Sequence, residues 1–310
     1  MEHVGSSLRR LAESRGLEIT SSKQTLKKVE VIELVRQQRA ENRQDLVFNA
    51  RPFVLCGMPL KRPPAGTLIH RRRNGRFSLQ IQGHPDYGLP FGQDRLVIIW
   101  AATQAVRQQR RVVEFESGAQ ILEEFGLPHN GVSYRRLTDG FKRVFGSTIY
   151  FGTGEESCAH GVFDCARFCF FDRLRVWWSR DQRDDQTPVG ATNIIELSEN
   201  FWQEIRNHPI PGELNVVRGF ANFPGCLDFY LWLTWRCHSA RGREGIRMFG
   251  PTGLQAQLGS GEYLRPRDFR RTVARWLTQV RQCWPECPAR LDPDGENIYL
   301  APAAAIHKRL

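Results

Sequence analysis

The sequence lacks any apolar stretch that is long enough to span a lipid bilayer. Its first twenty residues, MEHVGSSLRRLAESRGLEIT, contain no apolar core of the kind that a signal peptide requires. These two absences predict a cytoplasmic protein that does not bind a membrane. In that compartment the eight cysteines are expected to be free thiols, because the cytosol keeps thiols reduced.

Motifs for several common kinds of catalysis are also missing. The sequence contains no Gly-x4-Gly-Lys-Ser/Thr phosphate-binding loop and no Gly-x-Ser-x-Gly nucleophile motif. It has no His-hydrophobic-His pair with a nearby tyrosine, so nicking of the rolling-circle type is not indicated. Acidic pairs such as Asp184-Asp185 lie in charged segments, where solvated charge is the ordinary interpretation. We therefore predict that the protein is not an enzyme and needs no cofactor.

One group of possible metal ligands is ambiguous. Cys158, His160, Cys165 and Cys169 are close in sequence, but their Cys-x-His-x4-Cys-x3-Cys spacing is not a familiar zinc motif. Cys165 and Cys169 also lie in a run with the pattern of a strand. The interpretation without a metal is favoured, and a metal-dependent nuclease is kept as the weakest alternative.

The charge balance favours a polyanionic partner. The chain has 44 Lys+Arg against 33 Asp+Glu, a net charge of +11, and far more arginine than lysine. Arginine is favoured where phosphates or guanine edges are bound by two parallel hydrogen bonds. The charge alone would also fit RNA or an anionic membrane. With 310 residues, 41% of them hydrophobic, the chain is large enough for two domains with cores of their own.

A succession of four elements occurs twice in the chain. It consists of an apolar helix, a short helix that ends at a glycine, an amphipathic basic helix and a hairpin. In the first copy the three helices are expected over 94–106, 119–126 and 134–146, and in the second over 227–235, 253–259 and 264–281. The first hairpin is expected to have GTGEESCAHG (152–161) at its tip, and the second turns at Asp294-Gly295. This order is that of a winged helix-turn-helix.

We therefore predict an α+β fold with two tandem winged-helix domains and a helical N-terminal arm. Residues 48–183 form the first domain and 184–310 the second, with the boundary in the loop-like stretch 180–190. Residues 1–47 form a polar arm with one amphipathic helix. Packing of this helix on the body is favoured over a dimerisation or partner helix, because its apolar stripe is short for a coiled coil.

The second basic helix is the strongest candidate for contact with DNA. On a helical wheel with ~100° per residue, its apolar side consists of Phe269, Val273, Trp276 and Val280. Arg267 and Arg271 fall on the opposite side, as a helix that enters the major groove requires. A solvated surface helix is the competing interpretation. The first basic helix is weaker, because Asp139 on its polar face would repel phosphate.

The residues predicted to contact DNA come from three segments. The second basic helix contributes Arg265, Arg267, Arg270, Arg271, Arg275 and Arg281, the first contributes Arg135, Lys142 and Arg143, and a loop contributes Arg241 and Arg243. The clusters His70–Arg73 and Arg107–Arg111 are favoured as solvated charge. Lys308-Arg309 could extend the contact of the second wing.

Four stretches of the sequence resemble the plasmid-encoded RepA family of replication initiators. They are FVLCGMPLKRP (Phe53–Pro63), YGLPFGQDRLVIIW with TQAVR (Tyr87–Arg107), FWQEIRNHPIP (Phe201–Pro211) and LDFYLWLTWR (Leu227–Arg236). Their order along the chain makes the resemblance far more specific than any one stretch. Phe91 stands where the family tends to have tyrosine, and Phe229 where it tends to have an aliphatic residue. The first 45 residues match nothing in the family.

The resemblance implies a bacterial, plasmid-encoded initiator that binds short direct repeats, called iterons, in duplex origin DNA. It implies that the C-terminal winged helix enters the major groove, whereas the N-terminal one serves dimerisation and contacts the backbone. Such initiators help to melt the origin, recruit the host helicase together with the host initiator, and often repress their own promoter as homodimers. The alternative is a winged-helix transcriptional regulator without an origin function.

Overall fold

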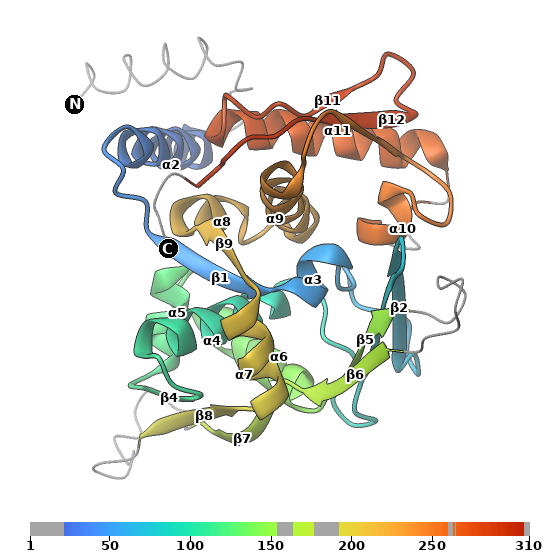
Figure 1. Cartoon of the computed structure of the whole chain (residues 1–310). Helices are drawn as coiled ribbons and strands as arrows, with labels where there is room; N and C mark the ends of the chain where they lie inside the picture. Colours follow the sequence, from blue (N-terminus) through green and yellow to red (C-terminus); the bar gives the residue numbers. More distant parts are fainter. Residues whose placement is uncertain (1–21, 154–163, 177–191, 260–262, 264, 307–310) are drawn as a thin grey trace, which may run out of the picture.

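The computed structural model describes residues 22–153, 164–176, 192–259, 263 and 265–306. In these ranges the chain combines helices with antiparallel sheets (Figure 1), as the α+β prediction required. None of the helices in the described ranges is both long and apolar enough to cross a lipid bilayer.

The described chain begins with a helix that packs on the body of the protein. Helix α2 (Ser22–Ala40) lies against α8 (Leu214–Phe220) and α11 (Pro266–Cys283), both much later in the sequence. The Arg39 side chain forms a buried ion pair with Glu213, and its Nε lies 2.8 Å from Glu213 Oε1. The favoured interpretation of this segment, a helix packed on the body, therefore agrees with the structure. Strand β1 (Leu46–Ala50) follows and pairs with β9 (Pro209–Glu213).

A four-stranded antiparallel sheet comes next. Its order is β2 (Ile69–Asn74), β3 (Phe77–Gln82), β5 (Thr148–Thr153) and β6 (Asp164–Cys169). A two-residue turn, Gly75-Arg76, joins β2 to β3, because Asn74 pairs directly with Phe77. Short helix α3 (Arg51–Leu55) precedes this sheet.

The first copy of the repeated unit contains all its expected helices and its expected hairpin, which belongs to a larger sheet. Helices α4 (Asp94–Gln108), α5 (Gly118–Glu124) and α6 (Gly131–Phe145) match the expected segments closely. Strand β4 (Val112–Phe115) joins a sheet of order β4-β8-β7, with β7 spanning Phe171–Arg175 and β8 Asn193–Leu197. The expected hairpin is present, because β5 and β6 pair antiparallel, and β5 also joins it to β3 in the four-stranded sheet. Most of its expected tip, 154–163, lies outside the described residues.

The strands on either side of the predicted domain boundary pair with each other. Position 183/184 lies outside the described residues, but β7 before it and β8 after it form an antiparallel ladder. Helix α7 (Glu199–Asn207) follows β8, and the Ser198 hydroxyl caps it by accepting from Phe201 N at 3.3 Å. Gln93 precedes helix α4, and Asp94 is the first residue of that helix.

The second copy has the predicted helices and hairpin in the predicted order, and an additional strand after its first helix that was not predicted. They are α9 (Pro224–Ser239), β10 (Glu244–Arg247), α10 (Leu254–Leu258), α11, β11 (Arg290–Leu291) and β12 (Asn297–Leu300). The three strands form a sheet of order β10-β12-β11.

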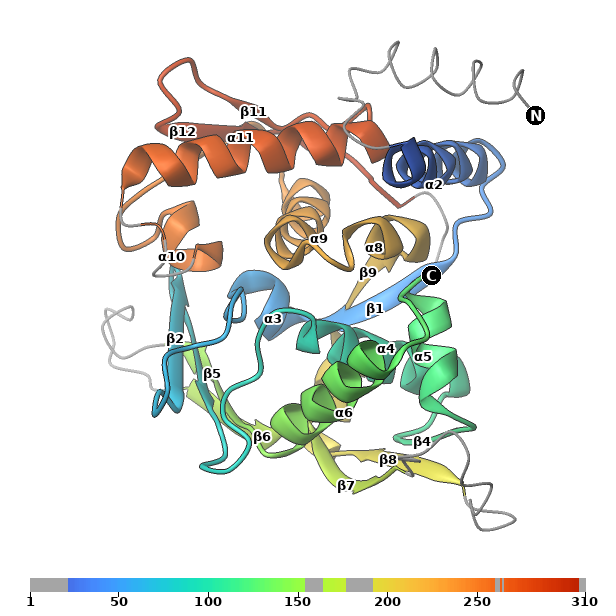
Figure 2. The same cartoon turned by 180° about the vertical axis from the view of Figure 1, so that it is seen from behind.

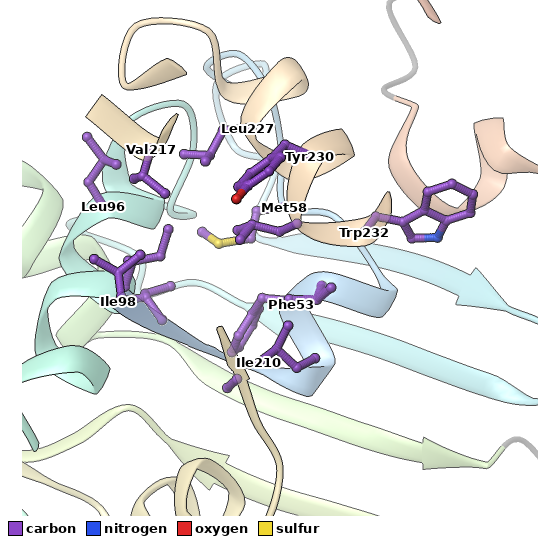
Figure 3. Packing of buried hydrophobic residues seen from close by; sticks show 14 of the residues in the cluster. Phe53, Met58, Leu96, Ile98, Ile210, Val217, Leu227, Tyr230 and Trp232 are labelled. Atoms are coloured by element: carbon purple, nitrogen blue, oxygen red, sulfur yellow. The ribbon is translucent and has the colours of Figure 1, made fainter. Parts of the chain in front are cut away.

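The centre of the molecule is built from the two most apolar helices, α4 and α9. Figure 3 shows their side chains packing with those of α3, β9 and the segment after α3. Tyr230 and Trp232 of α9 are completely buried, and each has a partner for its polar atom. The Tyr230 hydroxyl accepts from Glu213 N at 3.2 Å, and Trp232 Nε1 donates to Gln257 Oε1 at 2.9 Å. These two aromatic rings therefore add apolar area without leaving an unsatisfied group.

An ion pair in this core connects α4 to α9. Arg95 Nε lies 2.7 Å from Asp228 Oδ1, and Arg95 Nη2 lies 2.9 Å from Asp228 Oδ2. Arg95 also donates to the Met58 carbonyl at 3.3 Å, and both ionic side chains are less than 10% exposed. Burial raises the pKa of Asp228, and the charge of Arg95 opposes that rise. Removing either side chain would therefore leave the charge of the other buried without a partner.

We expect Asp228→Asn to lower the free energy of unfolding by about 3–5 kcal/mol, because it leaves the Arg95 charge buried without its partner. Urea denaturation followed by circular dichroism measures this change. The matched control is Glu114→Gln, which breaks the half-exposed Arg110–Glu114 pair at 3.6 Å. That control should cost less than about 1 kcal/mol. Equal losses in the two variants would contradict a structural role for the buried pair.

Candidate nucleic-acid interface

The two copies of the repeated unit share one topology. Each runs helix, strand, helix, helix, strand, strand: from α4 to β8 in the first copy and from α9 to β12 in the second. In each sheet the last strand lies between the other two, giving the orders β4-β8-β7 and β10-β12-β11. The first copy differs by the additional strands β5 and β6 between α6 and β7. The predicted internal repeat is therefore present in three dimensions.

Helix α11 has one buried and one exposed side, as the helical wheel predicted. Phe269, Val273, Trp276 and Val280 are all buried. On the other side the Arg267 and Arg271 side chains are 66% and 73% exposed, and Arg275 is exposed as well. Asp268 lies 3.9 Å from Arg267 and 3.8 Å from Arg271, both loose contacts that leave the guanidinium groups available to solvent. This side of α11 is a row of accessible donors on a well-anchored helix.

Two other arginines of α11 have partners within the protein. Arg270 forms an ion pair with Glu296, in the turn between β11 and β12, and its guanidinium lies 5.0 Å from the centre of the Phe249 ring. Arg281 donates to the Ala289 carbonyl at 2.5 Å. These contacts connect α11 to the hairpin that follows it. Arg265 is exposed at the residue that precedes the helix.

The first basic helix, α6, presents only part of the predicted set. Arg135 and Lys142 are exposed. Arg143 is buried, so its selection as a DNA contact was wrong. Its Nε and Nη2 lie 2.6 Å and 2.9 Å from the two carboxylate oxygens of Asp94, and its guanidinium lies 4.6 Å from the centre of the Phe91 ring.

Gly140 explains how α6 comes so close to Asp94. A Cβ at residue 140 would lie 2.8 Å from Asp94 Oδ1, which is too short for a real contact. The glycine therefore brings the two helices close enough for Arg143 to bind Asp94 with two hydrogen bonds. A wheel of α6 alone cannot reveal this partner, because Asp94 is on another helix.

In the cluster Arg107–Arg111, the arginines have acidic partners within the protein. Arg107 binds Glu124 at 2.8 Å, Arg110 lies 3.6 Å from Glu114, and Arg111 lies 3.1 Å from Asp172. In β2, Arg71 and Arg73 are exposed, whereas His70 and Arg72 are partly buried. Burial lowers the pKa of His70 to about 4, so the ring is neutral at pH 7 and donates from Nε2 to the Gly57 carbonyl at 3.0 Å. Lys308-Arg309 lies outside the described residues.

The cysteines of β6 do not form a metal site with each other. Cys165 and Cys169 are four residues apart on one strand, which separates them by about 13 Å. Within the described ranges no group of three or more histidine, cysteine, aspartate or glutamate side chains is placed to hold a metal ion. Cys158 and His160 lie outside those ranges.

The loop residues Arg241 and Arg243 are exposed and lie next to β10. Arg243 shares a groove with two residues that the sequence analysis did not select, Arg290 and Tyr299. The signal that could have found them is the alternation of side chains along the short strands β10, β11 and β12.

Figure 2 shows the two basic helices α6 and α11 on the same side of the molecule, with α11 at the top and α6 below it. The exposed arginines of α11 and the exposed basic residues of α6 therefore belong to helices that one extended partner could approach together.

Comparison with known proteins identifies a family for part of the chain. A family model described as "Plasmid encoded RepA protein" matches residues 160–249. The resemblance to plasmid-encoded RepA proteins is thus confirmed. The matched residues run from β6 to just beyond β10, so helix α11 lies outside them.

Solved structures with a similar fold come from RctB. A structure of its domain 2 and domain 3 superposes with a TM-score of 0.50 at 12% identity, covering 74% of this chain and 85% of that one. A second structure of RctB domains 2-3 gives 0.49 at 13% identity, covering 78% and 93%. At 12% identity, the likeness to the first of these structures is one of fold alone. No curated protein sequence matches the chain.

We expect Arg143→Met to destabilise the protein by about 3–5 kcal/mol, because it leaves the buried Asp94 carboxylate without its partner. Lys142→Met, at the neighbouring exposed position, should change the free energy of unfolding by about 0.5 kcal/mol or less. Urea denaturation of both variants separates the two roles. A neutral Arg143→Met would show that this arginine is free in solution and would restore it as a DNA contact.

Proposed function

We propose that this protein is a plasmid replication initiator that binds iteron-type direct repeats in duplex DNA. The observation that carries the proposal is the exposed side of α11, where Arg267, Arg271 and Arg275 project from a helix whose other side is buried. The match to plasmid-encoded RepA proteins over residues 160–249 supports the biological setting.

The proposal assigns a winged helix to each repeated unit. In the second unit α10 and α11 form the helix-turn-helix, and the hairpin β11–β12 forms the wing. The positive φ of Gly295, +66°, supports a tight turn at the end of that hairpin. In the first unit the strand order β4-β8-β7 corresponds to that of the second, so the proposed wing is β7–β8 rather than β5–β6.

Helix α11 is proposed to enter the major groove with its first turns nearest the bases. Arg267 and Arg271 are then placed to contact base edges or phosphates, with Arg275 one turn further along. Arg270 has a different role. Through its ion pair with Glu296 it holds the helix and the wing in one arrangement, so both can contact the duplex at a fixed spacing.

The first unit is proposed to contact the DNA backbone and a second copy of the chain. Helix α6 exposes Arg135 and Lys142 for phosphates, whereas Val132 and Phe145 on the same helix are 68% and 38% exposed. These two apolar side chains are the part of α6 proposed to face the second copy. A homodimer, repression of the protein's own promoter, and recruitment of the host helicase and host initiator complete the proposal, which requires no catalysis. The proposed location is the bacterial cytoplasm.

Footprinting of the purified protein on the DNA that flanks its own gene tests this proposal. We expect protection of direct repeats spaced near multiples of the helical turn, about 10–10.5 bp, beside an A·T-rich segment. Protection of a promoter palindrome alone would favour a transcriptional regulator. The absence of any protection at low salt would contradict DNA binding by the basic helices.

We expect Arg271→Ala to weaken binding to the protected sequence by about 1–3 kcal/mol if Arg271 contacts a base, and to affect random duplex much less. Fluorescence anisotropy at several salt concentrations measures both. Arg43→Ala is the matched control, because Arg43 is 80% exposed and lies in the segment after α2. Binding of the unchanged protein should fall steeply with salt, since several phosphates are neutralised. Equal effects of the two substitutions would contradict the role of α11.

A further inference from the structure

The sheet β10-β12-β11 has a second, outward face with its own chemistry. Side chains alternate along a strand, so residues that pair directly share a face. Ile246 pairs with Ile298, both are buried, and this face is the inner one. The intervening pair, Gly245 and Tyr299, is therefore on the outer face, and Arg290 of β11 pairs with Tyr299 from the other side.

Tyr299 rests on the backbone of the neighbouring strand. A Cβ at residue 245 would lie 3.0 Å from Cε1 and 3.3 Å from Cδ1 of the Tyr299 ring, so the glycine is what allows the ring to lie there. Tyr299 nevertheless remains 43% exposed, which is high for an aromatic side chain in a sheet. The outer face of the sheet thus presents the ring of Tyr299, which packs on the backbone of β10 and is partly exposed to solvent.

Three arginines surround this ring. Arg243 and Arg247 are two residues before and two residues after Gly245, and alternation places them on the outer face with Arg290. Arg243, Arg290 and Tyr299 line a single groove of about 400 Å³. In the described part of the chain, none of the three arginines lies within ion-pair distance of a carboxylate.

Acidic side chains near the groove have hydrogen-bond or ion-pair partners within the protein. Asp292 lines it, but its carboxylate accepts from Glu296 N at 2.7 Å and from Asn297 Nδ2 at 2.9 Å. Glu244 is turned to the inner face and binds Arg236 at 2.9 Å. The hydrogen bond from Asn297 lowers the pKa of Asp292, so this carboxylate stays negative. Three arginines against this one carboxylate still leave a net positive charge around Tyr299.

This groove is on the opposite side of the second unit from the exposed arginines of α11. Ile246 and Ile298 on the inner face belong to the same buried cluster as Phe269 and Val273 of α11, so the outer face of the sheet points away from that cluster. Figure 1 shows β11 and β12 in front of α11, and Figure 2, seen from behind, shows α11 in front of them. A rigid duplex seated on the exposed side of α11 and against the tip of the β11–β12 hairpin would leave the outer face of the sheet open.

We propose that the outer face of β10-β12-β11 is a second nucleic-acid site, which binds a single strand. Bases in a duplex are stacked on each other and do not offer their faces to a tyrosine, whereas unpaired bases do. Tyr299 stacks on one base, and Arg243, Arg247 and Arg290 bind the phosphates on either side. The site goes beyond the proposed reading of duplex DNA and does not depend on it.

The test uses the full chain and a fluorescein-labelled thymidine oligonucleotide of about 16 nucleotides, with anisotropy as the readout. We expect Tyr299→Ala to weaken binding of this strand by about tenfold or more, because base–aromatic stacking is lost. Tyr299→Phe keeps the ring and should bind like the unchanged protein. Both substitutions are at an exposed position, and thermal unfolding of each variant checks that the fold is intact.

A duplex of mixed sequence separates this site from α11. Arg271→Ala should weaken binding of the duplex and leave binding of the single strand unchanged, whereas Tyr299→Ala should do the reverse. Arg290→Ala should weaken binding of the single strand more at low salt than at high salt. Unchanged binding of the strand by Tyr299→Ala, or loss of both ligands in the same variants, would overturn the second site. If the unchanged protein binds the single strand but not the duplex, the result contradicts only the function proposed for α11.

Discussion

The buried ion pair between Arg95 and Asp228 is the constraint on which the rest of the structure depends. It holds α4 and α9, the first helices of the two repeated units, together with the Met58 carbonyl. These three points of contact come from three of the stretches that resemble plasmid-encoded RepA proteins. Only Asp228 of these three lies within residues 160–249, which match the family model. Helix α11, which is proposed to contact DNA, is anchored to the same scaffold, because the ring centre of Trp276 lies 5.8 Å from that of Phe229 in α9.

Much of the fold could be predicted from the sequence because its helices have strong local signals. The apolar runs of α4 and α9, the buried side of α11 and the cap at Ser198 all depend on neighbouring residues. The partner of each strand could not be predicted in the same way. The predicted hairpin β5–β6 is present, but its place beside β3, and the pairing of β7 with β8, depend on contacts far away in the sequence.

The candidate site could be predicted only for those arginines whose guanidinium groups are not held by other parts of the protein. Arg267 and Arg271 have only loose contacts and are exposed, as their position on the helix predicts. Arg143, with the same residue type and a similar helix, was misassigned because Asp94 and Phe91 occupy its guanidinium. Residue type and periodicity state which arginines a helix can present, whereas tertiary contacts decide which of them remain available.

The packing of α2 on α11 has a consequence for how the chain matures. Arg36 donates to the Gln282 carbonyl, 246 residues later in the sequence. At about 5–20 residues per second, a ribosome needs about 12 to 50 s to make that intervening length. Helix α2 therefore emerges long before the surface that covers Ile32 and Val35, and the native N-terminal packing can be completed only after the last long helix has been synthesised.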